Sequence, residues 1–194
     1  MDGDRFLQIL SKHFARLKFP TTKRRIISGW AARCCTFASD DVSFKVGQAG
    51  FPAAVLAEFR SRGGPVVDAH DAAKPIGKVI AYSILEAGLW VVVQIAEGSK
   101  AADQCWADIL TGCKRGFSIR WSHDPTGDTL LGGLRLTKAS RLLEVSVVEQ
   151  PSELTAGFVI GRHDNPVTTP TVESPSTCAR VSARKRLFIQ EVLK

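Results

Sequence analysis

The stretch at residues 88–95, Gly-Leu-Trp-Val-Val-Val-Gln-Ile, constrains the fold more than any other part of the chain. Its centre at 89–93 is the longest apolar run and is typical of a buried strand. No apolar run approaches the roughly 18 residues that are needed to span a bilayer. A second extended stretch at 74–82 comes just before it, with a turn near Glu86 and Ala87 between them. The two stretches predict an antiparallel hairpin, and therefore a β-sheet.

Short strands and a few helices are predicted on either side of this hairpin, which indicates a mainly β fold with helices (α+β). Apolar residues recur at helical spacing over 4–18, over 51–59 and over 99–110, where Ser99 would be the N-cap. Extended stretches are expected at 26–37, 42–46, 65–71, 115–121, 142–148 and 156–160. The piece at 130–136, with Gly132 and Gly133 inside, is either a strand or a loop. Residues 138–141 read as a connector.

A chain of 194 residues is long enough for one domain with appendages. We expect an N-terminal amphipathic helix and basic linker at 1–25, a main domain at 26–162, and a flexible basic tail at 163–194. The first helix could dock on the domain, pair with a second copy or bind a partner. The tail is rich in Pro, Thr and Ser and has no periodicity until its last residues.

The net charge of +7 is concentrated at the two ends of the chain. Residues 1–33 contribute +6 and residues 178–194 contribute +4, whereas the segment between them has a net charge of −3. This distribution argues against a nucleic-acid reader built on the central domain. This distribution is compatible with nonspecific contact of the basic ends with nucleic acid or with acidic partners.

The five cysteines give no sign of a metal or disulfide framework. They form no C-x-x-C pair, and no histidine lies at zinc spacing from them. We therefore expect reduced, packed thiols, no metal and no cofactor. The start of the chain lacks the basic residues and apolar stretch of a secretory signal, so a cytoplasmic protein is expected.

Three polar residues, each on or beside a predicted strand, could form a nucleophilic site. Ser118 lies in the middle of the short strand Gly-Phe-Ser-Ile-Arg-Trp, His70 lies at a strand end, and Glu144 lies within 142–148. A serine hydroxyl needs a base to take its proton and a third group to hold that base in the right tautomer. Taken alone, Ser118 would be interpreted as an ordinary strand serine and Glu144 as an exposed strand residue.

The order of these segments resembles the prohead (capsid maturation) serine proteases of tailed bacteriophages, which are similar in fold to the herpesvirus assemblins. The resemblance covers about residues 28–160. The matching pieces are Gly29-Trp30-Ala31, Ala49-Gly50-Phe51, His70-Asp71 with Pro75-Ile76-Gly77-Lys78-Val79, Gly116-Phe117-Ser118-Ile119, and Leu143-Glu144-Val145-Ser146-Val147-Val148 with Pro151 and Ala156. Each piece is weak by itself, and the ordered set is fairly specific.

This resemblance implies a serine endopeptidase on a closed antiparallel β-barrel flanked by helices, with 26–162 as the protease domain. Ser118 would be the nucleophile, His70 the general base and then acid, and Glu144 the residue that orients His70. The chain departs from the family pattern at Arg120 and Trp121, where smaller residues are common.

Two further points stay open at the sequence level. Asp68 and Asp71 flank His70 and could compete for its nitrogen, so Glu149 and His123, the latter in a predicted loop, remain alternative third members. The oxyanion-hole donors are expected either at 131–135 or near Ser140 and Arg141.

The resemblance also implies a setting and partners. Such a protease would act inside the immature capsid in the host cytoplasm, cleave the scaffold protein and the major capsid protein, and then digest itself. Pairing of two copies is possible by analogy with assemblins. The main alternative is an inactive protease-like module that assembles capsids or binds scaffold. Another hydrolase using Asp71 and His70 is not favoured, because no G-x-S-x-G elbow is present.

Overall fold

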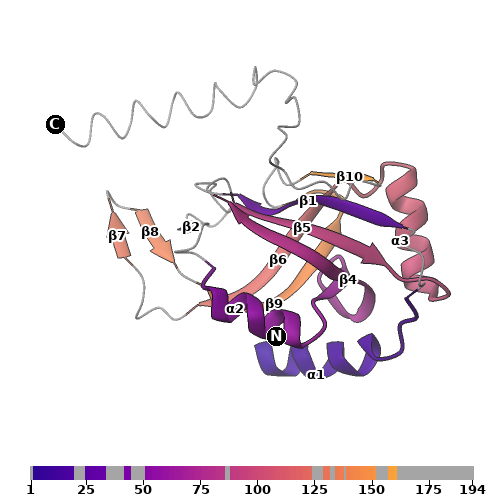
Figure 1. Ribbon diagram of the computed structural model, residues 1–194, viewed down its shortest axis with the longest axis horizontal. Coiled ribbons are helices and arrows are strands. Elements are labelled where there is room, and N and C mark those ends of the chain that lie inside the picture. The colour runs from indigo at the N-terminus through magenta and orange to yellow at the C-terminus, as the bar shows by residue number, and fades with distance from the viewer. Residues whose placement is uncertain are drawn as a thin grey trace, which may run out of the picture.

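The computed structural model describes residues 2–19, 25–33, 42–44, 51–85, 88–123, 129–131, 134–137, 139–151 and 157–160. These residues form a mixed α+β fold (Figure 1). The elements in chain order are α1 (Gly3–Phe14), β1 (Ile26–Arg33), β2 (Val42–Phe44), α2 (Ala53–Ser61), β3 (Pro65–Asp68), β4 (Asp71–Leu85), β5 (Gly88–Ile95), α3 (Lys100–Leu110), β6 (Gly116–His123), β7 (Thr129–Leu131), β8 (Leu134–Thr137), β9 (Ala139–Val148) and β10 (Phe158–Ile160). None of the described helices is long and apolar enough to cross a membrane.

A curled sheet of seven strands forms the centre of the molecule. Its strand order is β10-β1-β5-β4-β3-β9-β6, and a separate small sheet has the order β2-β8-β7 (Figure 1). The predicted hairpin is confirmed as the antiparallel pair β4 and β5. Register shifts between Val79 and Ala81 of β4, and between Trp30 and Ala32 of β1, mark bulges that bend these strands. The bends let the sheet curl around its own inner face.

The expectation of an antiparallel barrel is wrong at one strand pair of the seven-stranded sheet, and β2 and β8 of the small sheet are also parallel. β3 pairs with β9 in parallel, with Val66 opposite Val145 and Asp68 opposite Val147. A parallel pair needs a long connection between its strands, and here β4, β5, α3 and β6 lie between β3 and β9. The antiparallel barrel was implied by the family resemblance, and no local pattern in the sequence indicates the direction in which β3 and β9 pair.

Closure of the barrel is not shown by the strand ladders among the described residues. The edge strands β10 and β6 meet only at the isolated bridge between Gly116 and Gly157. The rings of Phe117 and Phe158, 5.1 Å apart between centroids, lie next to this bridge. The backbone just before β10 also lies very close to Gly29. A Cβ added at Gly29 would be 2.3 Å from the carbonyl oxygen of Gly157. The sheet therefore curls until its two edges touch at one point.

The continuous apolar run of β5 is explained by burial on both faces of the sheet. Leu89, Val91 and Val93 point into the main core on the inner face. Trp90 and Val92 point the other way and pack in a smaller cluster with Ile26. A strand that is covered on both faces needs apolar residues at every position. An alternation of apolar and polar residues would bury polar side chains on one face.

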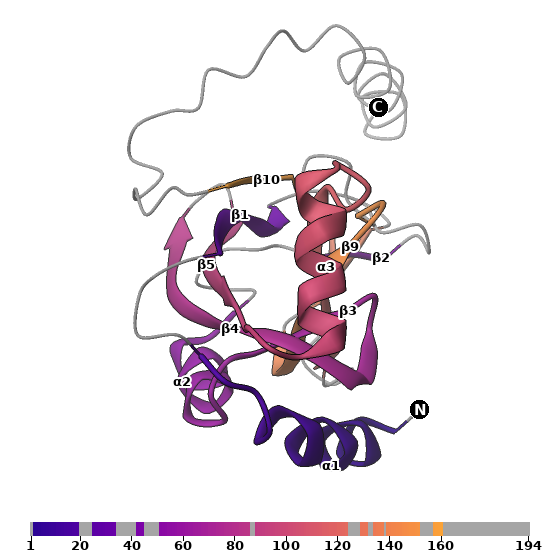
Figure 2. The same ribbon diagram turned by 90° about the vertical axis from the view of Figure 1, so that its right-hand side faces the viewer.

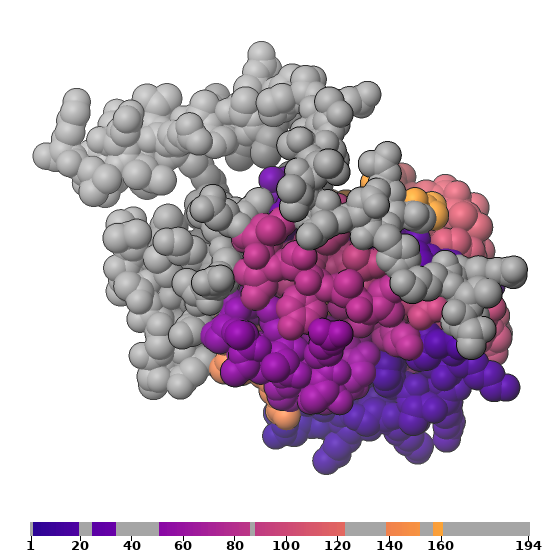
Figure 3. All heavy atoms as spheres, in the orientation of Figure 1, coloured from indigo at the N-terminus to yellow at the C-terminus, as the bar shows by residue number. Residues whose placement is uncertain are grey.

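Helix α1 docks on the sheet, which confirms the first of the three possibilities expected from its sequence and leaves the other two untested. Phe6, Leu7 and Leu10 are buried in a cluster with Val67 of β3, Ala72 of β4 and Leu143 of β9. Figures 2 and 3 show α1 lying along the lower side of the molecule, against these strands. The helix ends at Phe14, earlier than the predicted 18, although Leu17 still packs on the main core.

Several element boundaries differ from the predictions. The expected connector at 138–141 belongs to β9 from Ala139 onward, and the expected loop residue His123 is the last residue of β6, paired with Ala139. The ambiguous piece at 130–136 contains parts of β7 and β8. Most of the basic linker and the whole tail at 163–194 lie outside the described residues, and the division into domains stays a prediction.

Candidate active site

Ser118 is the third residue of β6, and strand register decides what it faces. β6 pairs antiparallel with β9 so that Ser118 is directly opposite Ser146. Directly opposed residues project from the same face of a sheet, and residues two apart on one strand share that face. Glu144 and Ser146 therefore lie on the same face as Ser118. Val145 and Val147 point into the main core, so the polar face is the outer one.

His70 reaches this face from a tight two-residue turn. Asp68 at the end of β3 pairs with Asp71 at the start of β4, so Ala69 and His70 alone form the connection. Both have positive φ, +46° and +61°, as the central residues of a type I′ hairpin turn do. Neither is glycine, so holding both in this region costs free energy, and surrounding contacts must stabilise the turn.

The three predicted side chains meet at His70. Its Nε2 lies 3.0 Å from Ser118 Oγ, and its Nδ1 lies 2.6 Å from Glu144 Oε1. Glu144 is fully buried and Ser118 is 7% exposed, whereas 31% of the His70 side chain is accessible. With Glu144 ionised, the proton belongs on Nδ1, which leaves the Nε2 lone pair facing the serine hydroxyl. This arrangement can remove a proton from Ser118.

A bulge in β9 sets the position of Glu144. Arg120 pairs with Glu144 but Trp121 pairs with Leu142, so Leu143 is an extra residue on β9. The guanidinium of Arg62, at the end of α2, donates to the carbonyl oxygens of both Leu142 and Leu143. The bulge also breaks the alternation expected for this strand, because Leu143 packs with α1 while Leu142 packs in the main core.

Ser146 links the turn of His70 to the carboxylate of Glu144. Its hydroxyl accepts the His70 backbone N–H at 2.9 Å and donates to Glu144 Oε2 at 2.7 Å. It also lies 3.2 Å from His70 Nδ1. Beside it, the Ala69 backbone N–H donates to the Val147 carbonyl oxygen at 3.1 Å. The strained turn is thus held against β9 by two hydrogen bonds.

The aspartates that flank His70 are bound to other groups and do not compete for its imidazole in this arrangement. Asp68 forms an ion pair with Lys114, whose side chain is 6% exposed. Burial lowers the pKa of Lys114, but the hydrogen bond and charge of Asp68 outweigh it and raise that pKa above its usual value. Asp71 accepts the Ala73 N–H at 2.9 Å and lies 3.2 Å from the Lys74 ammonium.

The alternative third members are placed differently from Glu144. Glu149 follows the end of β9 and is exposed. His123 lies five residues beyond Ser118, at the far end of β6. Of the expected oxyanion donors, residues 132–133 are outside the described residues. Ser140 and Arg141 lie in β9, where Arg141 pairs with Asp4 at 2.7 Å, a contact that raises the pKa of Arg141.

The side chain of Arg120 has a partner in helix α1. Its guanidinium carbon lies 4.6 Å from the centroid of the Phe6 ring, within the range of a cation–π contact. Phe6 belongs to α1, so the long side chain two residues beyond Ser118 contacts the docked helix. Helix α1 is therefore a close neighbour of the site on the outer face.

Sequence reasoning missed three residues that hold the site in place. Ser146 could have been found, because it lies two residues after Glu144 and so shares its face in any strand. Arg62 and Lys114 gave no such signal, since each acts on a segment that is remote in sequence. Only the folded chain brings them to the strands that carry Glu144 and His70.

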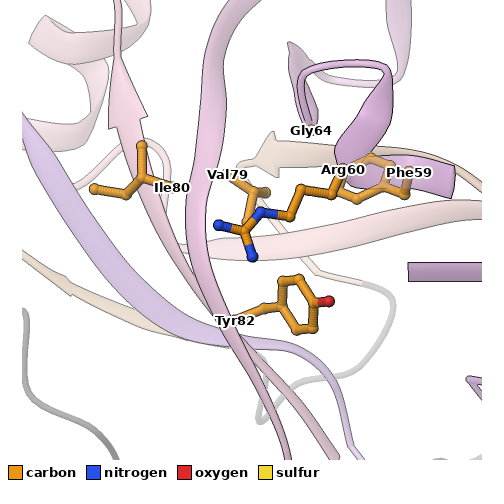
Figure 4. Close-up of a pocket in the computed structure, with 6 residues that line it drawn as sticks. All are labelled: Phe59, Arg60, Gly64, Val79, Ile80 and Tyr82. Atoms are coloured by element: carbon orange, nitrogen blue, oxygen red, sulfur yellow. The ribbon is translucent and has the colours of Figure 1, made fainter. Parts of the chain in front are cut away.

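No metal centre adds to this site within the part of the chain that is described. Those residues contain no cluster of His, Cys, Asp and Glu that could hold a metal ion. A shallow depression between α2 and β4 is lined by Phe59, Arg60, Gly64, Val79, Ile80 and Tyr82 (Figure 4). Arg60 lies over the Tyr82 ring there, and none of the three site residues lines it.

Comparison with solved structures found proteins of similar fold. The chain is similar to KSHV protease, solved in complex with a hexapeptide phosphonate inhibitor, with a TM-score of 0.49 and 13% sequence identity. The match covers 84% of this chain and 75% of that one. No family model matches the sequence. No curated protein matches it either.

Proposed function

We propose that this protein is a serine endopeptidase in which Ser118 is the nucleophile, His70 the general base and Glu144 the residue that orients His70. One observation carries the proposal: a single imidazole lies 3.0 Å from a serine hydroxyl and 2.6 Å from a fully buried carboxylate. Ser118 lies 48 residues after His70 in the chain, and Glu144 lies 74 residues after it. Activation of a serine requires a base that is hydrogen-bonded to its hydroxyl and an acid that is hydrogen-bonded to the base.

The reaction follows from this geometry. Ser118 Oγ attacks the carbonyl carbon of the scissile peptide while His70 Nε2 takes the hydroxyl proton. The resulting imidazolium is stabilised by Glu144 and returns the proton to the leaving amine as the C–N bond breaks. Water then hydrolyses the acyl ester by the same steps in reverse and regenerates the hydroxyl. Backbone N–H groups must stabilise the oxyanion, each by about 3 to 4 kcal/mol in the barrier.

In this proposal the substrate is an extended polypeptide. Its main chain would bind as a strand and bring one carbonyl group within reach of the Ser118 hydroxyl. Recognition through backbone hydrogen bonds suits a protease that cuts several different proteins.

The biological setting in this proposal comes from the resemblance to the prohead proteases of tailed bacteriophages. The enzyme would cleave the scaffold protein and the major capsid protein inside the immature capsid, and then itself. A closed barrel, pairing of two copies and location in the host cytoplasm belong to the same proposal. The basic ends of the chain would bind nucleic acid at most nonspecifically.

Replacing Ser118 by Ala tests the proposal directly. The variant should keep the wild-type thermal unfolding, and it should no longer cleave co-expressed scaffold and capsid protein. A fluorophosphonate probe should label the wild type at Ser118. Mass spectrometry should find trimmed termini only in the wild type.

The inactive scaffold-binding module gives the opposite results. It predicts no probe labelling at Ser118 and identical termini in both proteins. Processing that continues at the normal rate in Ser118→Ala would refute the assignment of the nucleophile.

A further inference from the structure

We infer that Ser146 is a positioning residue that holds the general base and its orienting acid together. The inference rests on the proposed serine protease function and extends it to a residue outside the three reacting groups. Ser146 is fully buried, yet its hydroxyl contacts both His70 and Glu144.

The place of Ser146 in the sheet gives it access to all three site residues. β9 lies between β3 and β6 in the strand order. On one side Ser146 is directly opposite Ser118, and on the other it is opposite Val67, just before the turn that carries His70. Glu144 lies two residues earlier on the same strand.

The hydrogen bonds of Ser146 satisfy two groups that need partners. The His70 N–H lies inside a two-residue turn, where it has no ladder partner in the β3 and β4 register, and it donates to Ser146 Oγ at 2.9 Å. Glu144 Oε2 accepts the Ser146 hydroxyl proton at 2.7 Å, while Oε1 accepts from His70. Both oxygens of a fully buried carboxylate thereby receive a donor, which such a charge requires.

These contacts give Ser146 two linked effects on the site. Holding the His70 N–H keeps the turn at positive φ and the imidazole in line with Ser118. Donating to Oε2 gives the carboxylate a second charge-assisted hydrogen bond and holds it in place to accept from His70 Nδ1. Ser146 therefore favours the protonation state in which Nε2 can accept the serine proton.

The other charged groups near the turn have partners of their own. Asp68 is paired with Lys114 and Asp71 with Lys74. Arg120, opposite Glu144 on β6, lies over the Phe6 ring. On the side of α2, Arg62 binds Glu58 at 2.9 Å. A change in pH response on removal of the Ser146 hydroxyl would thus come from the pair of Glu144 and His70.

Fluorophosphonate labelling of Ser118 as a function of pH tests this role without a known substrate. Ser146→Ala should be labelled about 10- to 100-fold more slowly than the wild type at neutral pH, because one charge-assisted hydrogen bond is lost. The pH at which labelling falls to half its maximum on the acidic side should rise, because Glu144 loses a hydrogen-bond donor while keeping its contact with His70. If the Ala variant does not fold, Ser146→Cys keeps the size of the side chain with a much weaker donor and should give the same changes.

Ser28→Ala is the matched control, because Ser28 is also a fully buried strand serine. Its hydroxyl has no hydrogen-bond partner among the described residues, so its removal should leave the labelling rate and its pH midpoint unchanged.

The possible outcomes separate the two claims. A wild type that the probe does not label would overturn the proposed function, and the role of Ser146 with it. If the wild type is labelled, a Ser146 variant with the same rate, or with a slower rate but an unmoved pH midpoint, would overturn the positioning role alone.

Discussion

At the scale of single residues, Glu144 is the group whose role the geometry defines most sharply. It is a fully buried carboxylate with one oxygen 2.6 Å from His70 Nδ1. In Glu144→Gln the amide can donate to Nδ1, which moves the imidazole proton to Nε2, where it blocks proton transfer from Ser118. We expect labelling of Ser118 by a fluorophosphonate to slow by about 10²- to 10⁴-fold.

Glu149→Gln provides the comparison for this prediction. Glu149 is exposed beyond the end of β9, so its substitution should leave the labelling rate within about twofold of the wild type. A larger loss in Glu149→Gln than in Glu144→Gln would show that the orienting acid has been assigned to the wrong residue.

At the scale of secondary-structure elements, helix α1 is expected to be part of the folded unit. Leu10 is 2% exposed and packs in the cluster that includes Val67 and Leu143, on the strands that carry the site. Leu10→Ala should lower the free energy of unfolding by about 2 to 5 kcal/mol, because it leaves a cavity under the helix. Denaturant unfolding followed by circular dichroism would measure the change.

Lys12→Ala is the control on the same helix. Its side chain is exposed, so its effect should stay within about 0.5 kcal/mol. Equal, small effects from both substitutions would mean that α1 is a detachable arm that does not support the sheet.

At the scale of the whole molecule, the buried thiol of Cys105 couples folding to alkaline pH. Burial, and then the charge of Asp68, raises the pKa of Cys105 from 9.0 to about 12. Above pH 9 an unfolded thiol loses its proton while the folded one keeps it, so the folded state binds more protons and stability falls as pH rises. The loss continues up to about pH 12, at no more than about 1.4 kcal/mol per pH unit.

Comparing the wild type with Cys105→Ala isolates this contribution. We expect the difference in free energy of unfolding between the two proteins to be constant below pH 9. Between pH 9 and 12 the wild type should lose stability relative to Cys105→Ala. Urea unfolding at a series of pH values measures it. Parallel curves over the whole range would show that the thiol ionises as easily in the folded protein as in the unfolded chain.

The sequence by itself determined the local elements and the chemical types of the site residues. The apolar run of β5 and the helical spacing before Phe14 depend only on neighbouring residues, so periodicity reveals them. The same holds for Glu144 and Ser146 on one face of β9, because side chains alternate along any strand. The resemblance to a known family then selected Ser118, His70 and Glu144 as a set.

Only the tertiary structure decided how these elements meet. The parallel pairing of β3 with β9 brings the turn of His70 over Ser146, and strand register places Ser118 opposite it. Arg62 and the bulge at Leu143 then fix the strand that carries Glu144. Register, bulges and contacts between distant segments depend on the packing of the whole sheet, which leaves no local pattern in the sequence.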